Sequence, residues 1–159
     1  MVFLEAVTGY AVAWLLSFVA WEAIVALVLL NADIWFRDPF SVQQIVSWIL
    51  LIVCIVMAIH GFYILKAIGK PSGDFEHTTT LVKRSDYKYI RHPLYSSLSF
   101  MAWGAFLKDV LISSIVLVVI VTVSLVLTAR MQERENISRF GKSYSDYIKE
   151  TRMSIPFLF

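Results

Sequence analysis

Charged residues and cysteine are both scarce in this chain of 159 residues. Charged residues make up 16% of it, whereas a soluble domain carries about 25%. Hydrophobic residues make up 58%, and one soluble domain of this size has too little interior to bury that much apolar surface. The single cysteine, Cys54, excludes a disulfide framework and a cysteine-based metal site. A net charge of +2 without basic repeats argues against nucleic-acid binding.

Four apolar stretches are present instead, and a transmembrane helix needs about 20 such residues. They cover residues 6–30, 42–65, 93–107 and 110–129. The third stretch spans only about 22 Å at 1.5 Å per residue, so it needs residues 89–90 or a locally thinner bilayer to cross. A re-entrant third segment is the less favoured alternative. The sequence therefore predicts an all-α, polytopic membrane bundle of four transmembrane helices, forming one domain over residues 1–159.

The basic residues predict how this bundle is oriented. The 66–91 connection holds six of them and the tail from Arg130 holds six more, whereas the two other connections hold one each, Arg37 and Lys108. The positive-inside rule places the long connection and the C-terminal tail in the cytoplasm. With four spans the N-terminus is cytoplasmic as well, in a multi-pass protein of the cell membrane.

The tail has an amphipathic pattern that predicts a cytoplasmic helix over residues 130–149. Its apolar stripe consists of Ile137, Phe140, Tyr144 and Tyr147, at spacings of three, four and three. This helix is expected to lie on the membrane surface or to pack under the bundle.

Two ionisable residues, Glu22 and His60, stand inside apolar stretches. Such residues are expected to face the interior of a bundle. Each indicates either a functional site or a polar contact that fixes helix packing.

The start of the third apolar stretch carries the sequence Arg91-His92-Pro93-Leu94-Tyr95. Pro93 suits the first turn of a helix, because its missing N–H would have no intrahelical acceptor there. The free N–H groups of that turn and the positive end of the helix dipole favour a carboxylate or a phosphate. Taken alone, the motif is also compatible with simple anchoring at the membrane interface.

Several motifs taken together are more specific. The Arg-His-Pro-x-Tyr sequence is followed by a hydrophobic stretch, by Gln132-Glu133, and by Phe-Gly-x-x-Tyr-x-x-Tyr over residues 140–147. This combination resembles the isoprenylcysteine carboxyl methyltransferases, especially their prokaryotic relatives, and is similar to the phospholipid methyltransferases. The resemblance runs from about residue 79 to the C-terminus and includes the ending Met153-Ser154-Ile155-Pro156-Phe157.

The resemblance implies S-adenosylmethionine as cofactor, bound by a half of the chain that covers about residues 70–159. The positions that match the family's cofactor-binding residues are Thr79, Thr80, Leu81, Val82, Tyr87, His92, Pro93, Leu94, Tyr95, Gln132 and Glu133. Arg130 is the nearest match to the arginine that orients the acceptor. The chain departs from the family at Gln132, usually acidic, and at Ser85-Asp86, where a glycine usually precedes the position of Tyr87.

Helical spacing distinguishes the two glutamates of the tail. Glu133 shares a face with Ile137 and Phe140, whereas Glu135 lies about 200° away on the helix. We therefore expect Glu133 to contact the charged end of the cofactor.

The implied activity is that of a protein-S-isoprenylcysteine O-methyltransferase-like enzyme, which methylates a carboxylate. Methyl transfer requires alignment and exclusion of water, so no metal site is expected. A phospholipid amine or a small thiol are alternative acceptors. An NADPH-dependent oxidoreductase resembling sterol reductases, and a non-catalytic membrane scaffold, are alternatives of other classes. The expected partners are a lipophilic small molecule or prenylated substrate and membrane lipids, without nucleic acid.

Overall fold

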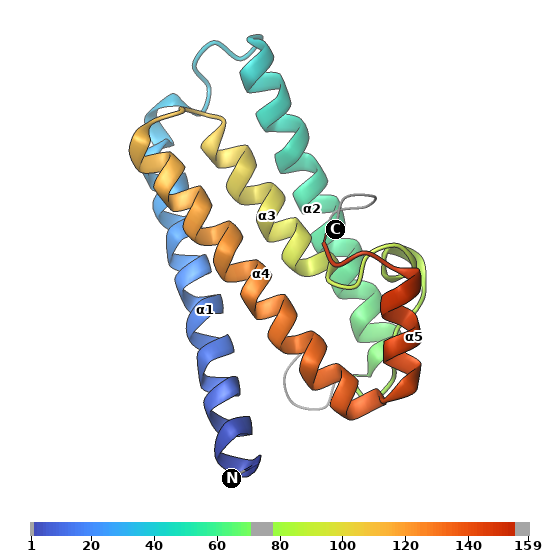
Figure 1. The fold of residues 1–159 in the computed structure, drawn as a ribbon. Helices are drawn as coiled ribbons and strands as arrows, with labels where there is room; N and C mark the ends of the chain where they lie inside the picture. Colours follow the sequence, from blue (N-terminus) through green and yellow to red (C-terminus); the bar gives the residue numbers. More distant parts are fainter. Residues whose placement is uncertain (1, 71–77, 155–159) are drawn as a thin grey trace.

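A computed structural model describes residues 2–70 and 78–154, and this part of the chain is helical (Figure 1). The five α-helices are α1 (Val2–Leu30), α2 (Val42–Gly69), α3 (Pro93–Phe106), α4 (Ile112–Phe140) and α5 (Lys142–Glu150). Two short 3₁₀ helices, η1 (Ala32–Ile34) and η2 (Ser85–Lys88), lie in the connections. The described residues include no strand, and an isolated bridge joins Ile90 and Arg152. The all-α prediction is confirmed.

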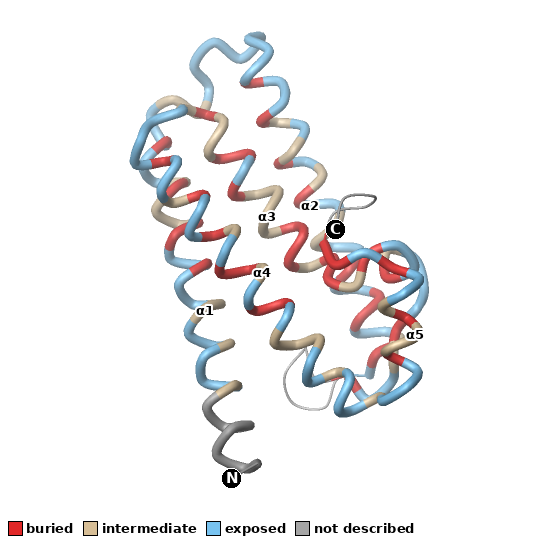
Figure 2. The backbone as a smooth tube through the Cα atoms, viewed as in Figure 1, coloured by how far each residue is buried: buried red, intermediate tan, exposed pale blue. Residues whose placement is uncertain are grey.

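Helices α1 to α4 run alternately up and down, and the short α3 lies between α2 and α4 (Figure 1). Helix α1 packs along α4, and α2 packs along α3. The α1–α4 interface is close because alanines at positions 20, 23 and 129 are buried in it together with Val121 and Leu125. Small side chains let membrane helices approach closely. Each helix has its buried residues on the face that packs against its neighbours, and its outer face is exposed (Figure 2).

Three helices are long and apolar enough to cross a membrane: α1 from Gly9, α2 and α4. Helix α3, predicted as the third of four spans over residues 93–107, has 14 residues and rises only about 21 Å. Four spans are thus not confirmed. The up-and-down order of four helices nevertheless holds, with α3 as a short member held inside the bundle (Figure 1).

The C-terminal end of α3 is capped by side chains of neighbouring helices. Ser47 donates to the carbonyl of Gly104 (2.7 Å), and Asn31 donates to that of Ala105 (2.9 Å). Gln43 donates to the carbonyl of Leu107 (2.8 Å). The last carbonyls of a helix lack intrahelical donors, so these side chains supply hydrogen-bond donors that water does not provide within a membrane.

Lys108, in the turn between α3 and α4, lies against the beginning of α2. Its ammonium donates to Gln44 Oε1 (2.9 Å) and lies 3.7 Å from the centroid of the Trp48 ring. Burial lowers the pKa of Lys108. The residue predicted to mark an external turn is therefore a buried cation that joins two helices.

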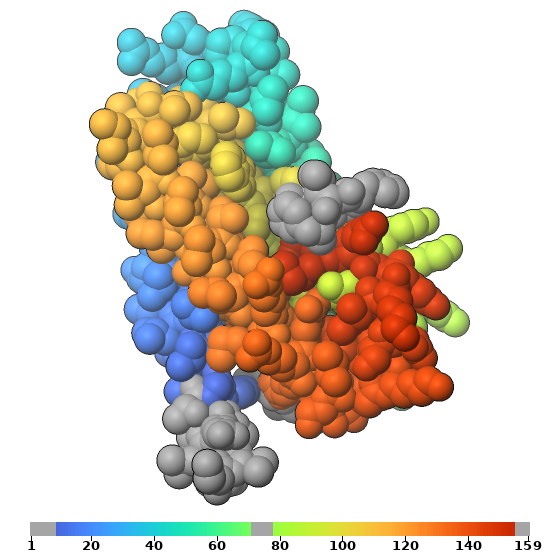
Figure 3. Space-filling model, viewed as in Figure 1, coloured from blue at the N-terminus to red at the C-terminus, as the bar shows by residue number. Residues whose placement is uncertain are grey.

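The predicted tail helix is wrong in its extent. Helix α4 continues through residues 130–140, and the chain then turns at Gly141, whose φ is +56°. The following α5 folds back along the bundle (Figures 1 and 3). The stripe is split by this turn: Ile137 is 40% exposed, whereas Tyr144 and Tyr147 are each 3% exposed.

The two ionisable residues predicted to face the interior lie elsewhere. Glu22 is exposed on the outer face of α1. The side chain of His60 is 49% exposed and its Nδ1 lies 2.9 Å from Asp86 Oδ2, so it joins α2 to η2. Ser85 Oγ lies 3.4 Å from the other ring nitrogen. Ser85 has φ +55°, in the left-handed region of backbone conformation that favours glycine.

Candidate functional site

The candidate site is a cleft at one end of the bundle, with a volume of about 80 Å³. Helices α2, α3, α4 and α5 and the segment before α3 all contribute to it. Its lining residues are Leu65, Thr78, Leu81, Val82, Tyr87, Arg91, His92, Pro93, Leu94, Tyr95, Gln132, Asn136, Phe140, Tyr144 and Tyr147.

One wall is the segment 78–82, which docks on the end of α2. A Cβ at Gly69 would lie 2.7 Å from Thr78 Cγ2, so only glycine permits this approach. The backbone N–H groups of Thr79 and Thr80 donate to the carbonyl of Gly69 (3.0 and 3.3 Å). Both threonines are exposed, whereas Val82 is buried. The hydrogen bonds of the two threonines therefore hold the segment against the end of α2, while Leu81 and Val82 line the cleft.

The N-terminus of α3 forms the centre of the cleft. Pro93 is the first residue of the helix, as predicted, and His92 is its N-cap residue. The backbone N–H of Arg91 donates to the carbonyl of Arg152 (2.8 Å), and that of His92 donates to the carbonyl of Met153 (3.1 Å). The chain after α5 is thus tied along the start of α3. Residues 155–157 of the predicted ending lie outside the described part.

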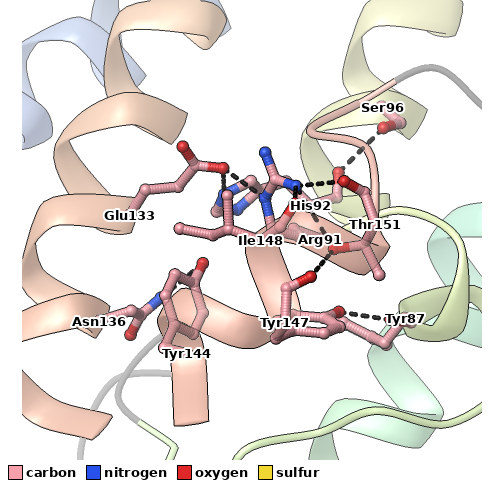
Figure 4. A network of polar contacts seen from close by, with 10 residues as sticks. All are labelled: Tyr87, Arg91, His92, Ser96, Glu133, Asn136, Tyr144, Tyr147, Ile148 and Thr151. Atoms are coloured by element: carbon pink, nitrogen blue, oxygen red, sulfur yellow. Dashed lines mark hydrogen bonds and ion pairs between the residues drawn. The ribbon is translucent and has the colours of Figure 1, made fainter. Parts of the chain in front are cut away.

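Arg91 connects three elements of the site (Figure 4). Its Nε lies 2.5 Å from Glu133 Oε1 on α4, and the Arg91 side chain is only 8% exposed. Its Nη1 donates to the carbonyls of Ile148 (3.1 Å) and Thr151 (2.5 Å). These carbonyls belong to the C-terminal end of α5, where a cation is favoured by the helix dipole.

His92 is buried beside this ion pair. The residue is 7% exposed, and its Nε2 lies 3.7 Å from Glu133 Oε1, too far for a hydrogen bond. Nε2 has no hydrogen-bond partner among the described residues. Its ring is stacked against that of Tyr95, with centroids 5.6 Å apart. A buried polar nitrogen at the edge of a cleft is a candidate ligand-binding atom.

Tyrosines from two elements close the opposite side. The hydroxyl of Tyr147 donates to the backbone carbonyl of Tyr87, which joins α5 to η2 (Figure 4). Asn136 Nδ2 lies 3.4 Å from the Tyr144 hydroxyl. Burial raises the pKa of Tyr144 and of Tyr147, so both hydroxyls stay protonated at neutral pH. The Lys83 ammonium lies 5.4 Å from the centroid of the Tyr147 ring.

Most of the residues predicted from the sequence come together here. The predicted residues that line the cleft are Leu81, Val82, Tyr87, His92, Pro93, Leu94, Tyr95 and Gln132. Glu133 contacts two of the lining residues without being one of them. Thr79 and Thr80 lie beside the cleft. Arg130 is exposed on α4 and does not line it.

Sequence reasoning did not assign several lining residues. Arg91, Phe140, Tyr144 and Tyr147 stood in the motifs without a predicted role in ligand binding. Asn136 carried a usable signal, because it follows Gln132 by four residues and so shares its helix face. Leu65 and Thr78 are brought in by the packing of α2 against the segment after it, which no local pattern indicates.

The fold and the cleft define a helical membrane protein with a polar site at one end of its bundle. Comparison with known proteins identifies the family: residues 42–143, more than half of the chain, match the phospholipid methyltransferase model. The chain therefore belongs to the phospholipid methyltransferase family. It is also 23% identical over 156 residues to the methanethiol S-methyltransferase of Crocosphaera subtropica (strain ATCC 51142 / BH68). That match covers 93% of this chain and 58% of the relative, so the chain spans less than two thirds of the relative's length.

Proposed function

We propose that this protein transfers a methyl group from S-adenosylmethionine to a lipophilic acceptor, most favourably the carboxylate of an isoprenylcysteine-like molecule. The family match supports methyl transfer as the reaction class. The observation that carries the proposal is the position of the buried His92 Nε2, which makes no hydrogen bond with the described residues, 3.7 Å from the Glu133 carboxylate of the Arg91–Glu133 ion pair at the N-terminus of α3. Polar groups of both signs therefore meet at the edge of the cleft.

The residues of the cleft fit the parts of S-adenosylmethionine. Its amino-acid end carries an ammonium and a carboxylate, which suit Glu133 and the first turn of α3 respectively. The contacts of Glu133 with Arg91 and His92 both use Oε1, so Oε2 is the oxygen we assign to the ammonium. The rings of Tyr87 and Tyr95 offer faces for the adenosine and for a cation. When bound, the cofactor supplies a methyl group on a sulfonium.

Arg91 is our candidate for orienting a carboxylate acceptor. Its contacts with the described residues use Nε and Nη1, and Figure 4 draws none from the remaining guanidinium nitrogen. A guanidinium binds a carboxylate with directed, charge-assisted hydrogen bonds. A carboxylate is ionised at neutral pH and needs no general base. Arg91 thus replaces Arg130 in this role, because Arg130 is exposed outside the cleft.

A small thiol is the second candidate acceptor. The relative from Crocosphaera subtropica is named a methanethiol S-methyltransferase. A thiol must lose its proton before methylation, since the thiolate is the nucleophile. His92 Nε2 is our candidate for accepting this proton, because it makes no hydrogen bond with the described residues.

The test begins with calorimetry on protein purified in detergent, titrated with S-adenosylmethionine and with NADPH. We expect only S-adenosylmethionine to bind. Glu133→Gln should weaken binding roughly ten- to a hundred-fold, because a charge-assisted hydrogen bond contributes about 1.5–3 kcal/mol. Glu135→Gln, on an exposed residue two positions later, is the matched control and should change binding little. NADPH binding would favour an oxidoreductase, and binding of neither would favour a scaffold.

The acceptor is identified by transfer of a labelled methyl group to a farnesylcysteine analogue, phosphatidylethanolamine or methanethiol. Labelling of the farnesylcysteine analogue alone supports the main proposal. Preferential labelling of methanethiol, lost in His92→Gln, supports the second candidate. Labelling of phosphatidylethanolamine alone contradicts both.

We also propose that the cleft faces the cytoplasm in the cell membrane, with both chain termini on that side. The basic residues of the segment before α3 and of α5 lie at the end of the bundle where α1 begins and α4 ends (Figure 1). A reporter fused after the last residue should be active only inside the cell. Activity only outside would reverse the orientation.

A further inference from the structure

Glu22 is exposed on the outer face of α1, deep within the apolar part of the helix. The opposite face, with Ala20, Ala23 and Ile24, is buried against the bundle. Glu22 stands eight residues before Leu30, about 12 Å from the end of the helix. The hydrocarbon core of a bilayer is about 30 Å thick, so a glutamate at this depth does not reach water.

The outer faces of the two other long helices differ from this one. On α2, Ile52 and Ile55 are 58% and 57% exposed, and on α4, Val119 and Val123 are 52% and 51% exposed. Side chains of this kind are suited to lipid. A carboxyl group facing lipid without a hydrogen-bond partner is costly, so an intramembrane glutamate requires a polar partner at its own depth.

The apolar residues around Glu22 have the spacing of three and four residues that is found where two helices pack side by side. Leu15, Phe18, Glu22, Val25 and Leu29 follow one another at spacings of three, four, three and four. Leu15, Phe18 and Leu29 are 58%, 49% and 69% exposed and Val25 is half-buried, so most of this face is left uncovered by the bundle. A repeat of 3.5 residues keeps one face of a helix directed at a parallel partner, and one polar residue in it fixes the register.

We propose that this face is a homodimer interface, in which α1 packs in parallel against α1 of a second copy and the two Glu22 side chains meet. A two-fold axis along the membrane normal brings identical residues together at the same depth. A protonated carboxyl group both donates and accepts, so two Glu22 side chains satisfy each other. A second copy supplies this partner automatically, whereas any other membrane protein would need its own polar group at that height.

The first experiment measures dimerisation in lipid vesicles by energy transfer between labelled copies. The wild type and Glu22→Gln should both dimerise, because an amide also donates and accepts. Glu22→Leu, which suits lipid and is not expected to impair folding, should weaken dimerisation about five- to thirty-fold, as expected for a polar contact between membrane helices. A monomeric wild type, or a Glu22→Leu variant that dimerises equally well, would overturn the proposal.

The second experiment maps the interface by disulfide formation in native membranes. On a Cys54→Ala background, Phe18→Cys and Val25→Cys should each cross-link two copies, because seam positions lie within disulfide range of their equivalents. Val119→Cys, on the outer face of α4, is the matched control and should remain monomeric. Equal cross-linking at Val119, or cross-linking of the α1 variants to a different protein only, would refute a homodimer through α1.

Discussion

Replacing Arg91 by lysine tests whether one guanidinium holds helix α5 in place beside the cleft. Arginine spans two separate acceptor groups, Glu133 on α4 and the carbonyls of Ile148 and Thr151 at the end of α5. Lysine retains the charge but has one compact ammonium without the planar fork, so it can serve only one of the two groups. The substitution therefore removes one set of charge-assisted hydrogen bonds while leaving the net charge unchanged.

The loss of one such hydrogen bond corresponds to about 1.5–3 kcal/mol. Because every 1.4 kcal/mol is a factor of about ten, local opening of α5 should become roughly ten- to a hundred-fold more frequent. Amide hydrogen exchange measures this opening directly. The amides to follow are those of α5 and of Arg152, which donates to the carbonyl of Tyr89 at 2.9 Å.

Arg84→Lys provides the control, because Arg84 is exposed in the same segment. It should leave exchange in α5 unchanged. Equal protection of α5 in Arg91→Lys and Arg84→Lys would refute the reasoning and show that packing of Tyr144 and Tyr147 alone holds the helix in place.

Three further substitutions test other contacts. Tyr147→Phe should lower the thermal unfolding temperature in detergent more than Tyr144→Phe, because the buried carbonyl of Tyr87 loses its donor at about 1–3 kcal/mol; equal shifts would contradict this. Gly69→Ala should weaken S-adenosylmethionine binding by displacing Thr78, whereas Gly9→Ala, with nothing within 4 Å of its Cβ, should not. Lys108→Met should destabilise the protein by about 1–3 kcal/mol, because buried Gln44 loses its donor; an unchanged unfolding temperature would argue against this contact.

The helices of this fold could be predicted from the sequence because long apolar stretches and Pro93 are local signals. The side of each helix that is buried in the bundle could not be predicted in this way. Between Gly9 and Leu30, helix α1 has apolar residues on all sides and one charged residue, Glu22, so only its packing through Ala20 and Ala23 against α4 shows that Glu22 faces outward. The break at Gly141 was present as a local signal, but the continuous amphipathic spacing on both sides of it favoured one helix.

The candidate site was likewise predictable in part: residues close together in the sequence could be assigned, whereas contacts between distant residues could not. Residues 91–95 are contiguous and could be assigned as one group. The ion pair of Arg91 with Glu133 joins residues 42 positions apart, and the contacts of Arg91 with α5 depend on the turn at Gly141. Arg130 was selected as the arginine nearest to the matching position, yet it is exposed on α4 and does not line the cleft that Gln132 lines.

The capping of α3 by side chains has a consequence for how the protein enters the membrane. The carbonyls of Gly104, Ala105 and Leu107 find their donors on Ser47, Asn31 and Gln43. Isolated in lipid, the end of this 14-residue helix would lose the side-chain donors to the carbonyls of Gly104 and Leu107, so we do not expect it to insert independently. The donors all precede α3 along the chain, and synthesis therefore delivers them to the bilayer before the carbonyls that require them.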